Sequence, residues 1–306
     1  MTGRRRLGRG AAAAGLAVAV LASSACTGSG DDATSSPAPG GSDAPAVAPA
    51  LAEVETFAFG LGVDPSEVDD QLRLGAHDLV VIDGDAATRD VVEALHADGA
   101  VVLAYLSAGT LEPYRAWFDE ARDADLLLER WEDWDEWYGA VARPELRRIL
   151  RREARRLLGR GVDGLFLDNV DMVDTHPAQA DGMRTLVADL DDEVGPDRLL
   201  FAQNGDPIEL GIIDHLDGWN REDVTFTFDF EADGYVPVEG ADREAAIDAI
   251  RAVRAEGVLV TTADYLPVVE PELAAEAAER ACSAGAIPFV ADLELTRLPT
   301  EPLRCD

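Results

Sequence analysis

Two acidic residues in this chain follow apolar runs that have the character of buried β-strands. Asp168 ends the apolar part of segment 163–171 (DGLFLDNVD), and Glu222 follows the run at 215–220. In a parallel α/β barrel, strands read as continuous apolar segments and functional residues lie where these strands end. Two opposed carboxyl groups can hydrolyse a glycosidic bond, one protonating the leaving oxygen and the other attacking or activating water. We therefore choose Asp168 and Glu222 as the candidate catalytic pair.

Other polar side chains follow the remaining predicted strands and should reach the same end of the fold. They supply carboxylates, amides, hydroxyls and one guanidinium, all of which form hydrogen bonds. We expect the substrate to contact Asp83, Tyr105, Ser107, Glu112, Arg115, Asn169, Gln203, Asn204, Asp264 and Tyr265. The chain has neither a Gly-rich phosphate loop nor a Gly-x-Ser-x-Gly motif, so the sequence predicts neither nucleotide binding nor a serine hydrolase.

Acidic residues at strand ends also have a simpler explanation, because Asp commonly caps the helix that follows. The chain contains 60 Asp and Glu residues, and some of them will follow strands by chance. We expect helix capping, or contacts behind the catalytic pair, for Asp171, Asp174 and Asp223.

Short apolar runs alternate with amphipathic stretches past residue 52, which is the pattern of βαβ units around a parallel sheet. Strands are predicted at 57–61, 78–83, 101–106, the end of 129–141, 163–171, 199–203, 215–220 and 257–262, and 287–290 either adds an edge or closes the barrel. Helices are predicted at 87–98, 144–158, 178–192 and 271–283. The pattern predicts a single (β/α)8 TIM barrel, in which all strand ends meet at one face.

Four tryptophans lie between the third predicted strand and the helix at 144–158: Trp117, Trp131, Trp134 and Trp137. Exposed aromatic rings can stack on sugars. Aromatic residues at such spacings are more often packing residues, however, because each ring buries a large apolar area. Both interpretations stay open at this point.

The N-terminus has the features of an export signal. Arginines precede an apolar run at 11–22, which is too short to span a membrane, and small residues lead to Cys26. This is typical of a lipoprotein signal over 1–25 with lipid attached to Cys26, and ordinary secretion is the alternative. The Gly, Ser, Pro and Ala-rich stretch 26–52 predicts a flexible tether before a barrel over 53–306. We expect an exported monomer, anchored to the outer face of a membrane or secreted.

Two cysteines remain after Cys26. Export places Cys282 and Cys305 in an oxidising compartment, where a disulfide between the C-terminal tail and the last predicted helix is favoured over two free thiols. The few cysteines and histidines lack the spacing of a zinc site. The sequence therefore predicts no structural metal and no cofactor.

The chain is strongly acidic, with a formal net charge of -34 at pH 7 and no lysine. Nucleic-acid binding needs basic patches that replace counterions, so this charge argues against it. A GC-rich coding bias or a saline habitat accounts for acidity equally well. If the charge has a functional role, it favours a cationic partner or substrate.

Several segments together resemble glycoside hydrolase family 114, a family of endo-α-1,4-polygalactosaminidases and related TIM-barrel proteins. The resemblance runs in order over about residues 57–298. It rests on 105–112 (YLSAGTLE) with Arg115, on Trp137, on 161–171 (GVDGLFLDNVD), on 203–204 (QN), on 217–222 (DGWNRE) and on 263–265 (ADY). A departure occurs at 57–61 (FAFGL), where the family more often has a Trp-x-Tyr-Gln-Leu start; the second predicted strand ends on 83–84 (DG), and the family's typical ending there is Asp-Tyr or Asp-Gly.

The resemblance implies endo-cleavage of α-1,4-linked galactosamine-containing polysaccharide, with catalytic residues at Asp168 and Glu222. A partly deacetylated polymer of this kind is cationic, which would match the acidic chain. We hypothesise a retaining mechanism with Asp168 as nucleophile and Glu222 as acid/base; a carboxyl separation of ~5 Å fits retention, and ~7 Å or more does not. The alternatives are a carbohydrate-binding lipoprotein that has lost turnover and a solute-binding or structural envelope protein.

Overall fold

The computed structural model describes residues 47–267, 270–299 and 301–305. The predicted signal sequence, Cys26 and most of the predicted tether lie outside the described residues. The last residues of that tether are folded: Pro49–Leu51 forms a 3-10 turn, and Leu51 is buried in the core. Within the described residues, no helix is both long and apolar enough to cross a membrane.

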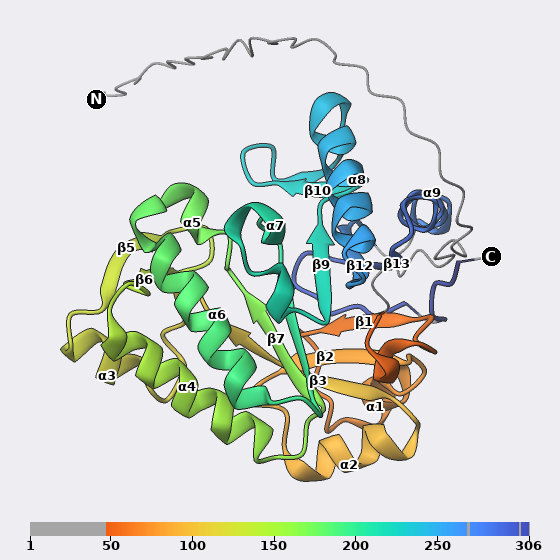
Figure 1. The fold of residues 1–306 in the computed structure, drawn as a ribbon. Helices are drawn as coiled ribbons and strands as arrows, with labels where there is room; N and C mark the ends of the chain where they lie inside the picture. Colours follow the sequence, from red (N-terminus) through yellow and green to blue (C-terminus); the bar gives the residue numbers. More distant parts are fainter. Residues whose placement is uncertain (1–46, 268–269, 300, 306) are drawn as a thin grey trace, which may run out of the picture. The chain divides into compact units, whose positions relative to one another are not determined.

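The centre of the fold is an eight-stranded parallel sheet that curves into a nearly closed barrel (Figure 1). Its strands, in spatial order, are β1 (Phe57–Gly60), β2 (Leu79–Asp83), β3 (Val101–Ser107), β7 (Gly164–Asp168), β8 (Leu199–Gln203), β9 (Gly218–Glu222), β12 (Leu259–Tyr265) and β13 (Ile287–Ala291). Phe57 of β1 packs against Phe289 of β13, with ring centroids 5.8 Å apart, so the first and last strands meet. The (β/α)8 barrel predicted from the sequence is confirmed.

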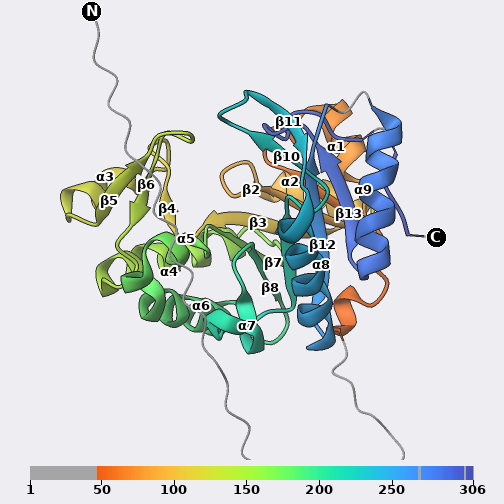
Figure 2. The ribbon, with the colours of Figure 1, turned by 90° about the horizontal axis from the view of Figure 1, so that it is seen from above.

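Helices surround the barrel, as Figures 1 and 2 show. The longer ones are α1 (Val68–Leu74), α2 (Arg89–Ala97), α4 (Pro144–Leu158), α6 (Ala180–Val194), α8 (Gly240–Ala255) and α9 (Pro271–Ala284). Short helices are α3 (Phe118–Asp123), α5 (Met172–Thr175) and α7 (Pro207–Leu210). In α4, Pro144 occupies the first turn and a leucine-rich face is buried, while the arginines lie on the outer face.

Large side chains fill the interior of the barrel. Phe166 lies between Phe59 and Phe201, with ring centroids 5.1 Å and 6.5 Å away. A Cβ atom on Gly218 would lie 2.0 Å from the Phe201 ring, so only glycine leaves space for that ring beside β9. The strands are therefore held by close packing as well as by their parallel hydrogen bonds.

One predicted strand is in a different place. The 129–141 segment does not supply a barrel strand; it forms most of a three-stranded antiparallel sheet of β4 (Thr110–Leu111), β6 (Glu136–Gly139) and β5 (Leu127–Trp131). The side chains of β5 are exposed or half-buried, so this strand lacks the burial on both faces that a barrel strand requires. Strand β13 takes the eighth place and closes the barrel, as one of the two roles considered for 287–290.

A second antiparallel hairpin, β10 (Phe226–Asp229) and β11 (Gly234–Pro237), follows β9. The first insertion lies between β3 and α4, and the second lies between β9 and α8, so both belong to the face where the barrel strands end. Seen from above, the β5–β6 hairpin and the β10–β11 hairpin flank the barrel (Figure 2). Neither hairpin was predicted from the sequence.

A disulfide joins Cys282 of α9 to Cys305 in the C-terminal tail. The tail is thereby held against the last helix of the barrel, as expected for two cysteines of an exported chain. The S–S distance is 2.07 Å.

Candidate active site

Three adjacent barrel strands end in the same way. Each finishes on a polar residue of the site: Asp168 on β7, Gln203 on β8 and Glu222 on β9. The next residue in each case has a positive φ of 56–58°: Asn169, Asn204 and Asp223. Asn and Asp tolerate this left-handed conformation better than most residues, and such strain concentrates at functional sites. The repeated turn brings Asp168 and Glu222 to one face with β8 between them.

Asp168 is held by three donors. The Tyr105 hydroxyl donates to Oδ2 at 2.7 Å, and Oδ1 accepts from the Asn169 backbone N–H at 2.6 Å and from Gln203 Nε2 at 3.0 Å. Burial raises the pKa of Asp168, while these hydrogen bonds favour its ionised form. Asn220 donates to Gln203 Oε1 at 2.9 Å, which fixes the amide so that its NH2 group points at Asp168.

Glu222 lies in a different environment. Asn204 Nδ2 donates to Glu222 Oε2 at 2.6 Å, and the Tyr265 hydroxyl donates to Oε1. Asn204 also accepts from the Glu222 backbone N–H at 3.0 Å, so one amide orients both ends of the residue. Burial, followed by the charges of Asp168 and Asp223, raises the pKa of Glu222 to about 8. Glu222 is therefore protonated near neutral pH and can donate a proton.

Both candidates line a cavity of about 400 Å³ at the mouth of the barrel. A cavity of this size falls in the range of small-molecule binding sites. Of the predicted substrate-contacting residues, the cavity wall contains Asp83, Tyr105, Glu112, Asn169, Gln203, Asn204 and Tyr265. It also contains Phe59, Leu61, Gly62, Tyr114, Trp131, Trp134, Glu136, Asp171, Leu293, Glu294 and Leu295.

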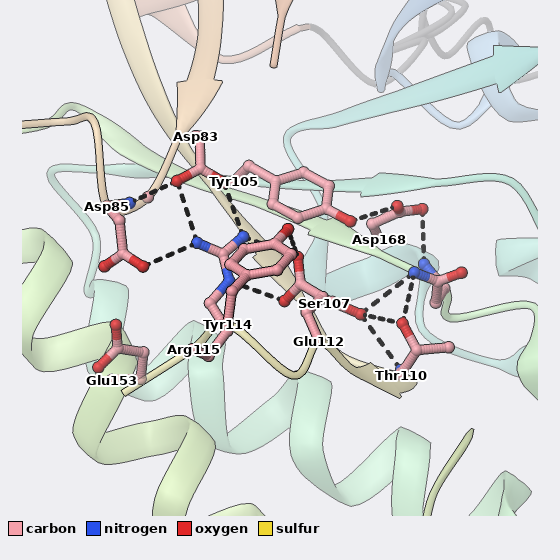
Figure 3. A network of polar contacts seen from close by, with 12 residues as sticks. Asp83, Asp85, Tyr105, Ser107, Thr110, Glu112, Tyr114, Arg115, Glu153 and Asp168 are labelled. Atoms are coloured by element: carbon pink, nitrogen blue, oxygen red, sulfur yellow. Dashed lines mark hydrogen bonds and ion pairs between the residues drawn. The ribbon is translucent and has the colours of Figure 1, made fainter. Parts of the chain in front are cut away.

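Arg115 was predicted to contact substrate, but it lies behind the cavity wall. Its guanidinium donates to both oxygens of Glu112 at 2.7 and 2.8 Å and to both oxygens of Asp83 at 2.7 and 3.0 Å. A further bond at 3.1 Å reaches Asp85, and Figure 3 shows the guanidinium at the centre of these carboxylates. Because Asp83 and Glu112 line the cavity, Arg115 positions cavity residues instead of facing the substrate itself.

Ser107 and Asp264 also lie outside the cavity wall. The Asp264 carboxylate accepts from the backbone N–H groups of Val224, Thr225 and Phe226 at 2.5–3.0 Å, which fixes the start of the β10–β11 hairpin. The Ser107 hydroxyl pairs with Thr110 Oγ1 at 2.8 Å and accepts from Asn169 Nδ2 at 3.1 Å. These contacts orient neighbouring loops, so both residues support the site from behind.

Three further carboxylates of the cavity were not predicted as substrate contacts: Glu136, Asp171 and Glu294. Glu136 comes from β6 and accepts from Thr110 Oγ1 at 2.6 Å, and burial raises its pKa to about 7. Asp171 stands at the N-terminus of α5 but makes no side-chain capping bond there, so its expected capping role is absent. Burial and the Asp168 charge raise its pKa to about 7 as well.

The sequence carried a signal for Glu136, because an acidic, Trp-rich insertion between a strand and a helix lies at the functional face of a barrel. The four tryptophans of this region divide between the two expected roles. Trp131 and Trp134 line the cavity. Trp117 is buried, and Trp137 packs against Phe118 with ring centroids 5.5 Å apart.

The site is rich in carboxylates, which also makes it a place to look for metal ligands. Within the part of the chain that the structure describes, no group of three or more His, Cys, Asp or Glu side chains is arranged to hold a metal ion. Most carboxylates of the cavity are instead bonded to amides, hydroxyls or Arg115, namely Asp83, Glu112, Glu136, Asp168 and Glu222. Such an arrangement suits proton transfer and nucleophilic attack by carboxyl groups.

The chain matches the model of glycoside hydrolase family GH114 over residues 40–297. An uncharacterized protein of Deinococcus radiodurans is 26% identical over 214 residues, which covers 66% of this chain and 67% of that protein.

Two solved structures share the fold. The glycoside hydrolase domain of PelA from Pseudomonas aeruginosa is 26% identical, with a TM-score of 0.69 over 79% of this chain and 96% of that domain. Ega3 from Aspergillus fumigatus, solved in complex with galactosamine, is 18% identical, with a TM-score of 0.63 over 86% of this chain and 98% of that chain. The family expected from the sequence motifs is confirmed: this chain belongs to glycoside hydrolase family GH114 and is a glycoside hydrolase.

Proposed function

We propose that this enzyme cleaves α-1,4-linked galactosamine-containing polysaccharide within the chain, by a retaining mechanism that uses Asp168 and Glu222. The observation that carries the proposal is the pair of carboxyl groups, held in one cavity by different sets of donors. Three hydrogen bonds favour the ionised form of Asp168 against burial, which raises its pKa, and Glu222, which accepts two such bonds, has a pKa raised to about 8. Carboxyl groups whose environments separate their protonation states can take the roles of nucleophile and acid.

In the first step, an oxygen of the Asp168 carboxylate attacks the anomeric carbon of the sugar. The glycosidic bond breaks, and Glu222 gives its proton to the leaving oxygen, so a glycosyl ester forms on Asp168 and one part of the polymer departs. In the second step, the Glu222 carboxylate takes a proton from a water molecule, whose oxygen attacks the same carbon. The ester bond breaks, which restores the Asp168 carboxylate and the protonated Glu222.

The proposed substrate follows from the family and is supported by the charge of the cavity. Asp83, Glu112, Glu136 and Asp171 line the cavity together with the catalytic pair. Arg115 balances part of this charge from behind the wall. A cavity with an excess of carboxylates attracts a cationic sugar, such as a galactosamine residue that carries a free ammonium group.

The cellular location is part of the same proposal. An exported enzyme held by a lipid on Cys26 would meet polysaccharide at the cell surface, whether that of its own cell or of a neighbour. Mass spectrometry of the membrane-extracted N-terminal peptide should detect the lipid on Cys26, and Cys26→Ser should release the enzyme into the medium. An unmodified Cys26 in a secreted enzyme would support ordinary signal cleavage.

The central experiment uses the chain without residues 1–25, carrying Cys26→Ser so that it stays in solution. It should release oligosaccharides from a partly deacetylated α-1,4-galactosamine polymer, whereas Asp168→Asn and Glu222→Gln should not. Glu272→Gln, a change at an exposed position on α9, is the matched control and should behave like the parent.

Proton NMR of the first products tests the stereochemistry. Retention requires that the new reducing end begins as the α-anomer, and an initial β-anomer would indicate inversion. If the parent binds the polymer without cleaving it, a carbohydrate-binding lipoprotein becomes the better interpretation. If it neither binds nor cleaves the polymer, the proposed sugar is wrong.

A further inference from the structure

The two hairpins at the barrel mouth touch each other through one aromatic contact. Trp134 lies in the turn between β5 and β6, and Phe230 lies in the turn between β10 and β11. Their ring centroids are 5.8 Å apart with an interplanar angle of 75°, which is an edge-to-face pair. Figure 2 shows the two hairpin tips approaching each other. Trp134 also lines the cavity that contains Asp168 and Glu222, so this contact borders the active site.

Each side of the contact continues into its own hairpin. Trp131 lies 6.5 Å from Trp134 and stacks on Tyr138 of β6 at 5.6 Å, with an interplanar angle of 9°. Trp131 is part of the cavity wall as well. The first hairpin therefore presents a supported aromatic surface to the cavity.

The second hairpin is supported in a similar way. Phe228 packs against Phe230 at 5.3 Å and against Tyr235 at 5.1 Å. The Tyr235 hydroxyl accepts from the Leu293 backbone N–H at 3.1 Å, and Leu293 is a cavity residue on the loop after β13. An aromatic series thus runs from Trp131 to Tyr235, which contacts Leu293, and we call the Trp134–Phe230 contact at its middle the bridge.

The bridge is the weak point of this series. Trp134 is 38% exposed and Phe230 is 46% exposed, and both lie in turns, whereas the Trp131–Tyr138 and Phe228–Tyr235 pairs join residues of hydrogen-bonded strands. A single edge-to-face pair between half-exposed rings is a small interaction. The tips can therefore separate while both hairpins stay folded.

The charges around the bridge favour such a separation. Glu132 and Asp133 on one tip and Glu231 and Asp233 on the other are exposed, and none of them forms an ion pair with a described residue. Arg130 on the first hairpin is paired with Asp135. Both tips are thus net acidic, and like charges repel. A polycation lying between or beneath them would remove this repulsion.

We propose that Trp134 and Phe230 determine specificity by forming a clasp that closes over a cationic stretch of the polymer. The inference rests on the proposed function and deepens it: the tips hold galactosamine residues with free ammonium groups beside the bond that Asp168 and Glu222 cleave. An ammonium group near the face of Trp134 or Phe230 gains a cation–π interaction, and the acidic tips add charge attraction. The enzyme then selects deacetylated stretches of the chain before the chemical step.

The test compares steady-state kinetics on polymers of one length and different degrees of N-acetylation. In Trp134→Ala and in Phe230→Ala, KM for the largely deacetylated polymer should rise about fivefold, in line with the loss of one aromatic or cation–π contact. The value of kcat should change less than twofold, because neither ring touches the catalytic carboxyls. For a highly N-acetylated polymer, KM should be the same in parent and variants.

The acidic tips are tested by Glu231→Gln/Asp233→Asn, measured against Glu93→Gln/Glu256→Gln, two exposed acids on the outer helical layer. The tip variant should raise KM for the deacetylated polymer, and the increase should shrink with added salt because exposed charges are screened. The control variant should match the parent at every salt concentration. Leu72→Ala, an exposed apolar change on α1 with 63% exposure, serves as the control for the aromatic variants.

The possible results separate the two proposals. If the parent cleaves the deacetylated polymer and Trp134→Ala has an unchanged KM for it, the clasp is wrong and the proposed function stands. A rise in KM that is equal for deacetylated and acetylated polymers would likewise overturn selection of the cationic stretch. If the parent cleaves no galactosamine polymer, the proposed function fails, and the clasp fails with it because the clasp is defined by that polymer.

Discussion

The two carboxylates proposed as catalytic and the hairpin tips lie on the same face of the barrel but are built in opposite ways. Asp168 and Glu222 end strands that are paired on both sides, and hydrogen bonds hold both carboxyls. Trp134 and Phe230 are carried by insertions that touch each other through one edge-to-face pair. In the proposed mechanism, the rigid part of the fold thus holds the reacting carboxyl groups, and the hairpins of the proposed clasp face the incoming polymer.

Glu136 shows that this division is not complete. It belongs to the β5–β6 insertion, yet its carboxyl group is buried in the cavity and bonded to Thr110. The insertion therefore adds charge to the active site in addition to an aromatic rim. Variants of the barrel strands should affect the chemical step, and variants of the insertions should affect binding.

Of the variants considered, Glu222→Gln should have the largest effect, and it tests whether the barrel strands carry the chemical step. The variant lacks the proton donor, and general acid–base catalysis contributes about 10²–10⁴-fold, so kcat should fall by that factor. The same substitution should also change how the free energy of unfolding depends on pH. The folded-state pKa of Glu222 is about 8 and lies above its ordinary value near 4.5. As pH rises between these values, the unfolded chain loses the proton first, and the free energy of unfolding falls.

The variant has no such group, so its melting temperature relative to the parent should rise from pH 5 to pH 9. Thermal unfolding at both pH values measures this difference, with Glu272→Gln as the control that should track the parent. A melting-temperature difference that does not depend on pH would contradict the raised pKa. A variant that keeps the parental kcat would contradict the catalytic role.

The sequence predicted an element best where the apolar pattern of the segment itself determines which of its faces is buried. Helix α4 has the predicted bounds, and strand β8 at Leu199–Gln203 does as well. Helix α4 has one apolar face, and strand β8 is apolar on both faces. Such patterns determine an element largely independently of the segments that pack against it. The β5–β6 hairpin was missed because its half-exposed strands depend on contacts with each other and with β4, and these contacts leave little local pattern.

The sequence also could not predict in which direction each side chain at a strand end points. Asp168 and Asp264 both lie near the end of a barrel strand, and both were predicted to serve the site. Asp168 faces the cavity, whereas Asp264 turns to three backbone N–H groups at the start of the β10–β11 hairpin. The difference depends on that hairpin, which was not predicted.

Arg115→Met should have the next largest effect, a loss of stability. It tests whether the ion pairs of Arg115 hold the loop after β4 against the barrel. The side chain of Arg115 is 6% exposed and is bonded to Asp83 at the end of β2 and to Glu112 in the loop after β4. Removing one partner of a buried ion pair leaves the other charges uncompensated, at a cost of about 3–5 kcal/mol. Urea denaturation should show a loss of unfolding free energy in this range.

Arg152→Met is the matched control, because Arg152 forms an ion pair with Glu120 but its side chain is 53% exposed. A surface pair of this kind contributes about 0–1 kcal/mol, so the control should lose little stability. Equal losses in the two variants would show that the Arg115 network is not a special support of the cavity wall.

Glu136→Gln has the smallest expected effect and sharpens the division between chemistry and binding. The pKa of Glu136 is raised to about 7, so at pH 5 the carboxyl is neutral and resembles the glutamine of the variant. At pH 8 it is ionised and can attract a cationic sugar. For the deacetylated polymer, the ratio of KM in the variant to KM in the parent should rise from about 1 at pH 5 to about two- to fivefold at pH 8.

Taking the ratio at each pH cancels the titration of the polymer itself, and kcat should remain within twofold of the parent. A ratio that is the same at both pH values would mean that the Glu136 charge does not contribute to binding, and a large fall in kcat would place Glu136 with the barrel carboxylates in the chemical step.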